Sequence, residues 1–172
     1  MRRLQCAVAA ALTLIAAPAT LSAAAFIEEH SAWTVMGRDD SCLVTTSAVD
    51  DSGAKLTFVH LPDRAFATIE SFEWTEVPGS WQDGAGNVEI AVGAASPVSL
   101  AARIDGLAIL LTDETGTAFS DLESALAAAT GIGAEGQPDL AIRDAAGTAI
   151  AGFSLLGAAE AIAKGASCAE AL

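Results

Sequence analysis

The sequence has no tyrosine, few basic residues and few histidines and cysteines. Eight Lys and Arg stand against 22 Asp and Glu, which gives a formal net charge of −14 over 172 residues. This charge repels polyanions, so it excludes nucleic acid as a partner. The two histidines, His30 and His60, do not occur in a metal-ligand spacing such as H-E-x-x-H, and we predict no metal site.

Motifs for catalysis and cofactor binding are also missing. The sequence has no G-x-S-x-G motif and no P-loop, so we predict no catalytic residue, no cofactor-binding residue and no cofactor. Residues 131–136 spell G-x-G-x-x-G, but they follow a predicted helix, whereas a dinucleotide site needs them between a strand and a helix. The acidic pairs at 39–40, 50–51 and 113–114 match no EF-hand loop, and we interpret them as solvated turns.

The amino-terminal residues form a pattern typical of a secretory signal peptide. Arg2 and Arg3 precede an apolar run over residues 4–17, and the small residues at 22–25 suit signal peptidase. An uncleaved membrane anchor is the alternative, although Pro18 and Thr20 would then lie within the span. We predict a signal peptide over residues 1–25, a single domain over 26–172, no membrane span after cleavage, and a periplasmic or secreted location.

Removal of the signal peptide would take away Cys6 and leave two cysteines. Thiols in an oxidising compartment are usually paired, so we predict a disulfide between Cys42 and Cys168. A reactive or metal-binding thiol pair is the alternative, but neither cysteine has a His or a second Cys at ligand spacing. The predicted bridge would fasten the end of the chain to an early strand.

Segments rich in β-branched and aromatic residues alternate with turn residues through most of the predicted domain. This spacing is typical of an antiparallel all-β domain. Turns are indicated at 50–53, at 83–87 and at 105–106, where Asp-Gly favours a tight hairpin. The predicted strands cover residues 32–36, 42–49, 55–61, 66–74, 88–92, 98–103, 107–112, 140–143 and 148–153.

Two helices are predicted within this β pattern. The first covers about residues 120–130, with Ser120 and Glu123 as a capping box and Gly131 as its stop. The second covers about residues 156–164 and ends near Gly165, just before Cys168. We therefore expect a mainly β, single-domain antiparallel sandwich or barrel-like fold with two short helices.

Three tracts resemble a known family. The tracts at residues 33–35 (Trp-Thr-Val), 42–44 (Cys-Leu-Val) and 153–159 (Phe-Ser-Leu-Leu-Gly-Ala-Ala) are similar to those of small periplasmic β-rich proteins of the invasion-associated locus B type. Proteins of that type are exported, and their biochemical role is poorly defined. The resemblance therefore implies a location and a fold class and leaves the activity open.

The best candidate for a functional surface is aromatic. Phe72, Trp74 and Trp81 lie close together in the sequence with Glu73, Glu76 and Asp83 among them, a composition expected of a partner site. The alternative is that these aromatics fill the core, and the small number of aromatic residues in an alanine-rich domain favours it. Trp33, in a strand before Cys42, is predicted to be a core residue.

These observations together predict an exported, non-enzymatic binding or interaction protein of the cell envelope. Its partner would be a protein or another envelope component, and the sequence leaves the oligomeric state open. A small secreted protease inhibitor is one alternative, because some inhibitors are β-barrels of similar size with a Trp and an early Cys in the first strands. An enzyme without a recognisable motif is the other.

Overall fold

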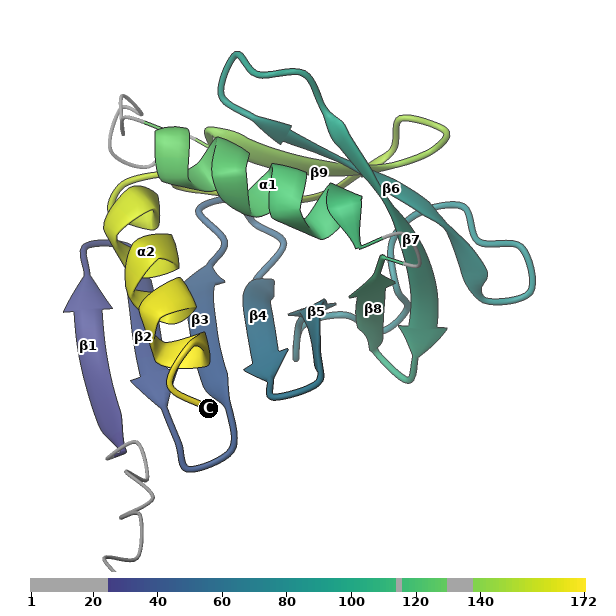
Figure 1. The fold of residues 1–172 in the computed structure, drawn as a ribbon. Coiled ribbons are helices and arrows are strands. Elements are labelled where there is room, and N and C mark those ends of the chain that lie inside the picture. Colours follow the sequence, from purple (N-terminus) through teal and green to yellow (C-terminus); the bar gives the residue numbers. More distant parts are fainter. Residues whose placement is uncertain (1–24, 114–115, 130–137) are drawn as a thin grey trace, which may run out of the picture.

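The structure is a computed structural model that describes residues 25–113, 116–129 and 138–172. The predicted signal peptide, apart from Ala25, lies outside the described residues, and so does the G-x-G-x-x-G segment at 131–136. The described chain forms one antiparallel sheet of ten strands with two helices packed against it (Figure 1). The sheet is not closed into a barrel and is consistent with a sandwich-like fold, so the predicted mainly β class is confirmed.

Every strand in the sheet pairs with an antiparallel neighbour. Their spatial order is β1-β2-β3-β4-β5-β8-β7-β6-β9-β10. A bridge between Ala48 and Phe153 brings the end of β3 to β10. The strands are β1 (Phe26–His30), β2 (Trp33–Gly37), β3 (Cys42–Ser47), β4 (Lys55–Leu61), β5 (Arg64–Glu70), β6 (Ala85–Val92), β7 (Val98–Asp105), β8 (Ala108–Thr112), β9 (Leu140–Asp144) and β10 (Ala149–Phe153).

The core lies on the face of the sheet that the helices cover. Alternate residues along each strand point to opposite faces, and one set is buried in nearly every strand. Trp33 and Phe58 stack at the centre, with ring centroids 6.3 Å apart. Trp33 is fully buried, which confirms its predicted place in the core.

Helix α1 (Thr117–Ala128) packs against β6 and β7, and helix α2 (Ala158–Ala169) packs against β2 and β3. The two helices also contact each other on the same side of the sheet (Figure 1). Phe119, Leu122 and Leu126 are the buried residues of α1, at a spacing that places them on one face of the helix. This stripe covers the core, where Phe119 meets Phe58 of β4 edge to face with ring centroids 6.0 Å apart.

The predicted capping box at the start of the first helix is wrong. Helix α1 begins at Thr117, and its N-cap is Gly116 in a left-handed conformation without a side-chain cap. The Asp113 carboxylate accepts a hydrogen bond from the backbone N–H of Phe119 at 3.0 Å, so a residue before the helix satisfies one of its free amides. Ser120 therefore lies inside the helix, and Glu123 is free to face the sheet.

The second helix continues past its predicted end. Gly165, which was expected near the end, lies inside α2 and is buried. A Cβ at this position would come within 2.4 Å of Val44 on β3, so glycine is needed here for the close approach of helix and sheet. Cys168 is in the last turn of α2 and is bonded to Cys42 on β3, as predicted.

The sequence prediction missed one strand, extended another too far, and placed residues 85–87 in a turn although β6 begins at Ala85. Strand β1 was not predicted, because Phe26–His30 contains two glutamates and has little apolar alternation. Strand β5 ends at Glu70, so the predicted strand over residues 66–74 is wrong beyond that point. The chain instead turns at Ser71, whose buried side chain accepts the N–H of Glu73 at 3.0 Å. This turn decides the position of Phe72.

Candidate functional site

The three aromatic residues predicted as a partner surface take two different environments. Phe72 is 99% exposed on the turn after β5. Trp74 and Trp81 are partly buried and pack against the core. The Trp81 indole donates to the Pro78 carbonyl at 2.9 Å, and its ring lies against Gly86. The two tryptophans therefore contribute packing, and Phe72 is the one member that projects fully into solvent.

The face of the sheet opposite the helices carries apolar and threonine side chains in two neighbouring rows. Cross-strand pairs align the apolar row Met36, Leu43, Val59 and Phe66 over β2–β5, and the threonine row Thr34, Thr45, Thr57 and Thr68 over the same strands. The Thr45 and Thr57 hydroxyls are 3.1 Å apart, within hydrogen-bond distance. All these side chains are partly exposed, and the two rows contain no charged residue.

At the β5–β8 side of this face lie two adjoining hollows, and Phe72 lines the smaller of them. The larger has a volume of about 520 Å³ and is floored by Phe66, Thr68, Ala108 and Leu110. The smaller, of about 290 Å³, lies between Phe72 and Leu107 and shares Asp105 and Ala108 with the first. We refer to this continuous surface as the Phe72 patch, and define it by Phe66, Thr68, Phe72, Leu107, Ala108 and Leu110.

Charged side chains border the Phe72 patch. Arg64 and Asp105 both line the larger hollow. Lys55 and Glu70 form a cross-strand pair next to it, and Arg103 pairs across strands with Leu110. An apolar floor with charges of both signs at its border is the composition of a binding surface, because the apolar area supplies affinity and the charges set orientation.

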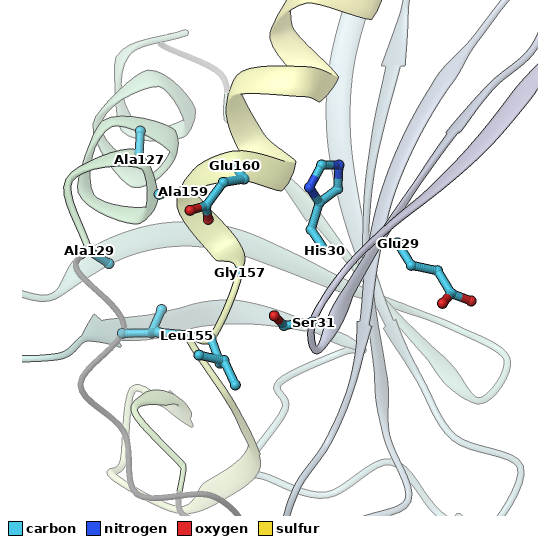
Figure 2. A pocket seen from close by; sticks show the side chains of 10 residues that line it. Glu29, His30, Ser31, Ala127, Ala129, Leu155, Gly157, Ala159 and Glu160 are labelled. Atoms are coloured by element: carbon cyan, nitrogen blue, oxygen red, sulfur yellow. The ribbon is translucent and has the colours of Figure 1, made fainter.

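A separate cleft of about 640 Å³ lies between the β1–β2 turn and the facing ends of the two helices (Figure 2). Its polar residues are Glu29, His30, Ser31 and Glu160, and the apolar part includes Leu155. Ser31 is in a left-handed turn conformation with a φ of 56°. His30 and Ser31 are adjacent in the chain, but Figure 2 shows their side chains apart, so they do not form a nucleophile and base in hydrogen-bond contact.

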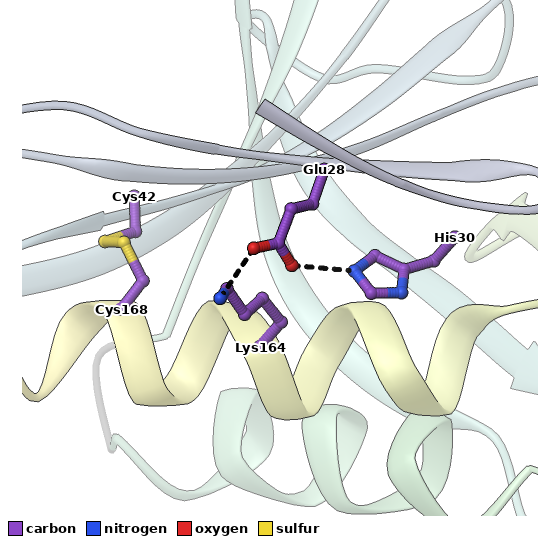
Figure 3. Close-up of polar contacts among 5 residues, drawn as sticks. All are labelled: Glu28, His30, Cys42, Lys164 and Cys168. Carbon is purple, nitrogen blue, oxygen red and sulfur yellow. Dashed lines mark ion pairs between the residues drawn. A yellow bond between two sulfur atoms is a disulfide. The ribbon is translucent and has the colours of Figure 1, made fainter. Parts of the chain in front are cut away.

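The His30 imidazole instead takes part in the attachment of β1 to α2 (Figure 3). The Glu28 carboxylate lies 3.7 Å from His30 Nε2 and 2.8 Å from Lys164 Nζ on α2. Lys164 Nζ also lies 4.7 Å from the centre of the Phe26 ring, a cation–π distance. These contacts, together with the nearby Cys42–Cys168 bridge, hold the first strand and the last helix together.

The second histidine lies close to a buried carboxylate, a contact that the sequence did not indicate. His60 Nε2 on β4 is 3.3 Å from a Glu123 carboxylate oxygen on α1, and the His60 side chain is 12% exposed. Burial raises the pKa of Glu123 above its usual value, while the nearby His60 works in the opposite direction. His60 is mostly covered because α1 lies over β4, where Glu123 meets His60 and Phe119 meets Phe58.

Asp144 is a buried carboxylate that connects distant segments. Its two oxygens accept the N–H of Ser80 at 2.6 Å and the N–H of Thr148 at 2.7 Å, and the residue is 1% exposed. Burial works to raise its pKa, but these backbone hydrogen bonds outweigh burial and the pKa of Asp144 is lowered. Its role is to hold the segment after Phe72 to the β9–β10 hairpin.

Two features are absent from the described residues. Within 25–113, 116–129 and 138–172, no group of three His, Cys, Asp or Glu side chains is placed to hold a metal ion. In the same part of the chain, neither helix is long and apolar enough to cross a membrane.

Comparison with known proteins gave no matching family model, no matching curated protein and no matching solved structure. Function is therefore inferred from the geometry of this chain.

The sequence could have indicated part of this site. Phe72 belongs to the predicted aromatic surface, and Phe66 and Thr68 lie in the strand predicted over residues 66–74. Leu107, Ala108 and Leu110 were missed, because they come from a hairpin far along the chain that pairs with β5 only in the folded sheet. The Asp105-Gly106 turn that precedes them was the available signal.

Proposed function

We propose that this protein is an exported binding protein of the cell envelope that acts by association through the Phe72 patch and not by catalysis. The observation that carries the proposal is the 99% exposure of Phe72 at the edge of a hollow that adjoins a second, larger one. A fully exposed phenylalanine leaves roughly 1.5–3 kcal/mol of burial energy unused. Exposed aromatic side chains next to apolar hollows are typical anchors of protein interfaces.

Export is supported by two independent observations. The amino-terminal segment has the pattern of a secretory signal, and the remaining cysteines form the Cys42–Cys168 bridge. Disulfides persist in oxidising compartments such as the periplasm, so a bridge is compatible with a location outside the cytoplasm. The three tracts similar to proteins of the invasion-associated locus B type are consistent with the same location.

A pull-down from envelope extracts tests the proposed function with a matched pair of leucines. Leu107 and Leu156 are 47% and 46% exposed, but only Leu107 belongs to the Phe72 patch. We expect Phe72→Ala and Leu107→Ala to lose a partner that wild type and Leu156→Ala retain, because only the first two remove apolar contact area at the patch. The circular dichroism spectra of all four proteins should agree.

The same partners on all four baits would contradict the use of the patch. Turnover of ester, peptide or glycoside substrates by wild type would contradict the non-enzymatic class. Stoichiometric inhibition of a protease that is unaffected by Phe72→Ala would instead support the inhibitor alternative.

A further inference from the structure

We propose that the partner at the Phe72 patch is a second copy of this chain, in a two-fold dimer where Phe72 of each copy enters the larger hollow of the other. This inference rests on the proposed function, since both use the same patch. It adds the identity of the partner and the geometry of the contact. Four features of the patch support it.

The first feature is a projecting ring on a well-defined turn. Phe72 is 99% exposed, but its neighbour Ser71 is 5% exposed and accepts the Glu73 N–H at 3.0 Å. Strand β5 ends immediately before this turn, at Glu70. The backbone on both sides of Phe72 is therefore already ordered, so that less conformational entropy is lost when the ring is buried.

The second feature is a receiving hollow on the same surface. The larger hollow, of about 520 Å³, is floored by Phe66 and Leu110 and shares Asp105 and Ala108 with the hollow beside Phe72. A cavity of roughly 150 Å³ is enough to hold a benzene ring. The hollow can accept an aromatic side chain from a partner, with the Phe66 ring available for an aromatic contact.

The third feature is that the projecting Phe72 ring and the receiving hollow lie on the same patch. In a two-fold interface the same surface meets itself, so that if residue i of one copy contacts residue j, residue j contacts i as well. A patch with both features therefore makes the same contact twice in a closed dimer. A partner without this symmetry could engage both features only if it supplied a ring and a hollow of its own at matching positions.

The fourth feature is charge. The whole chain carries a formal net charge of −14, so two copies repel each other in most orientations. Around the patch, however, the charges are balanced, because Lys55, Arg64 and Arg103 take outward positions on β4, β5 and β7 while Glu70, Asp105 and Asp113 line the two hollows. Arg64 and Asp105 line the same hollow, so two-fold contact can pair Arg64 of each copy with Asp105 of the other.

Sedimentation velocity of the purified, disulfide-bonded exported protein tests the dimer directly. We expect wild type to sediment as a concentration-dependent dimer. Phe72→Ala should raise the dissociation constant by about tenfold or more, as loss of an interface anchor does. Leu156→Ala is the control and should behave as wild type. A wild-type monomer at all concentrations, or an open series of larger oligomers, would overturn the two-fold dimer.

Complementation between two variants tests the contact itself. Phe72→Ala removes the ring and keeps the hollow, whereas Thr68→Trp fills the larger hollow, which Phe72 does not line, and keeps the ring. We expect each variant alone to be mainly monomeric, because neither can form the contact. A mixture should form heterodimers, since the ring of one variant can enter the hollow of the other. A mixture that dimerises no better than its components contradicts the proposed insertion.

A charge-reversal pair provides a second test that leaves the hollow unfilled. Arg64→Asp places two acids in each contact, and Asp105→Lys places two cations there. Each variant should therefore be weakened alone, while their mixture pairs opposite charges in both contacts and recovers dimer. Recovery should decrease as salt is added. Equal dimerisation of the variants alone and mixed would contradict the Arg64–Asp105 contact.

The outcomes separate this inference from the proposed function. If purified protein is monomeric but Phe72→Ala and Leu107→Ala still lose an envelope partner, the second copy is the wrong partner and the binding patch stands. If Phe72→Ala changes neither self-association nor pull-down, both proposals fail.

Discussion

Trp33 joins β2 to the segment that leads into α2. Its ring is fully buried against Phe58, and its indole N–H donates to the Ser154 carbonyl at 2.8 Å across 121 positions of sequence. A single side chain thus combines core volume with a long-range hydrogen bond. This is why it cannot be replaced by a smaller apolar residue without cost.

Trp33→Ala should lower the free energy of unfolding by about 3 to 5 kcal/mol in urea melts, because it opens a cavity in the core. Phe72→Ala is the control, since a fully exposed side chain should change stability by no more than about 0.5 kcal/mol. A loss below about 1 kcal/mol for Trp33→Ala would contradict its structural role.

Asp144 shows a second effect at the residue scale, one that depends on pH. The folded state holds the pKa of this carboxyl below its unfolded value through the amides of Ser80 and Thr148. Its contribution to stability is therefore complete above the unfolded pKa and is lost as pH falls through the folded pKa.

We expect Asp144→Asn to be less stable than wild type at neutral pH, with the difference shrinking as pH falls below about 4. Urea midpoints measured from neutral to acid pH check this. Asp51→Asn is a suitable control, because Asp51 is an exposed acid in a turn. A constant difference across the pH range would show that the Asp144 charge does not contribute.

Neither the Asp144–Ser80 hydrogen bond nor the His60–Glu123 contact was predicted from the sequence. Asp144 lies between two predicted strands, and Glu123 was assigned to a capping box. Local spacing does not show these partners, because Ser80 is 64 positions from Asp144 and His60 is on a different element from Glu123. Trp33, by contrast, was placed correctly, because a large aromatic in an alternating strand is buried by local pattern alone.

At the scale of elements, the contact of α2 with β3 depends on a glycine that would ordinarily weaken a helix. Gly165 is in the middle of α2, where glycine costs about 1 kcal/mol relative to alanine. The compensation is a close approach, because a Cβ at 165 would lie 2.4 Å from Val44 Cγ2. Helix propensity therefore favours alanine at position 165, whereas packing against Val44 favours glycine.

Gly165→Ala should destabilise the protein by about 1–3 kcal/mol, the typical cost of overpacking, despite its higher helix propensity. Val44→Ala removes the clashing methyl group. The double variant should therefore recover part of the loss, which a double-mutant cycle of unfolding energies would measure. Purely additive losses would show that Val44 does not limit the approach of the helix.

The same contact explains the error in the predicted end of the second helix. Glycine near the end of an apolar stripe usually indicates a stop, and Gly165 was interpreted in this way. The strand approaching from Cys42 to Ser47 makes a small residue necessary in the helix interior instead. Sequence position alone does not distinguish these two uses of glycine.

At the scale of the whole molecule, the Cys42–Cys168 disulfide joins residues 126 positions apart. It connects β3 to the last turn of α2, and the Glu28–Lys164 ion pair connects β1 to the same helix. The two ends of the described chain are therefore fastened to one another (Figure 3). Chain-entropy models assign the largest stabilisation to bridges that close long loops.

Replacement of both cysteines by serine should cost about 4–5 kcal/mol at most, because native-state strain subtracts from the loss of chain entropy. Reductant should lower the melting temperature of wild type to near that of the variant and leave the variant unchanged. If both cysteines of non-reduced, denatured protein react with an alkylating agent, the bridge is absent in the purified protein.

The sequence by itself determined the mainly β class, most of the strands, the buried Trp33 and the pairing of Cys42 with Cys168. Alternation and turn residues act over a few positions, and only two cysteines remain after the predicted signal peptide, so these features need no knowledge of distant contacts. Tertiary structure alone decided that Phe72 projects beside Leu107 and Leu110, that Asp144 is buried, and that His60 meets Glu123. Each of these depends on which distant segments the sheet and helices bring together. Local periodicity does not predict contacts between distant segments.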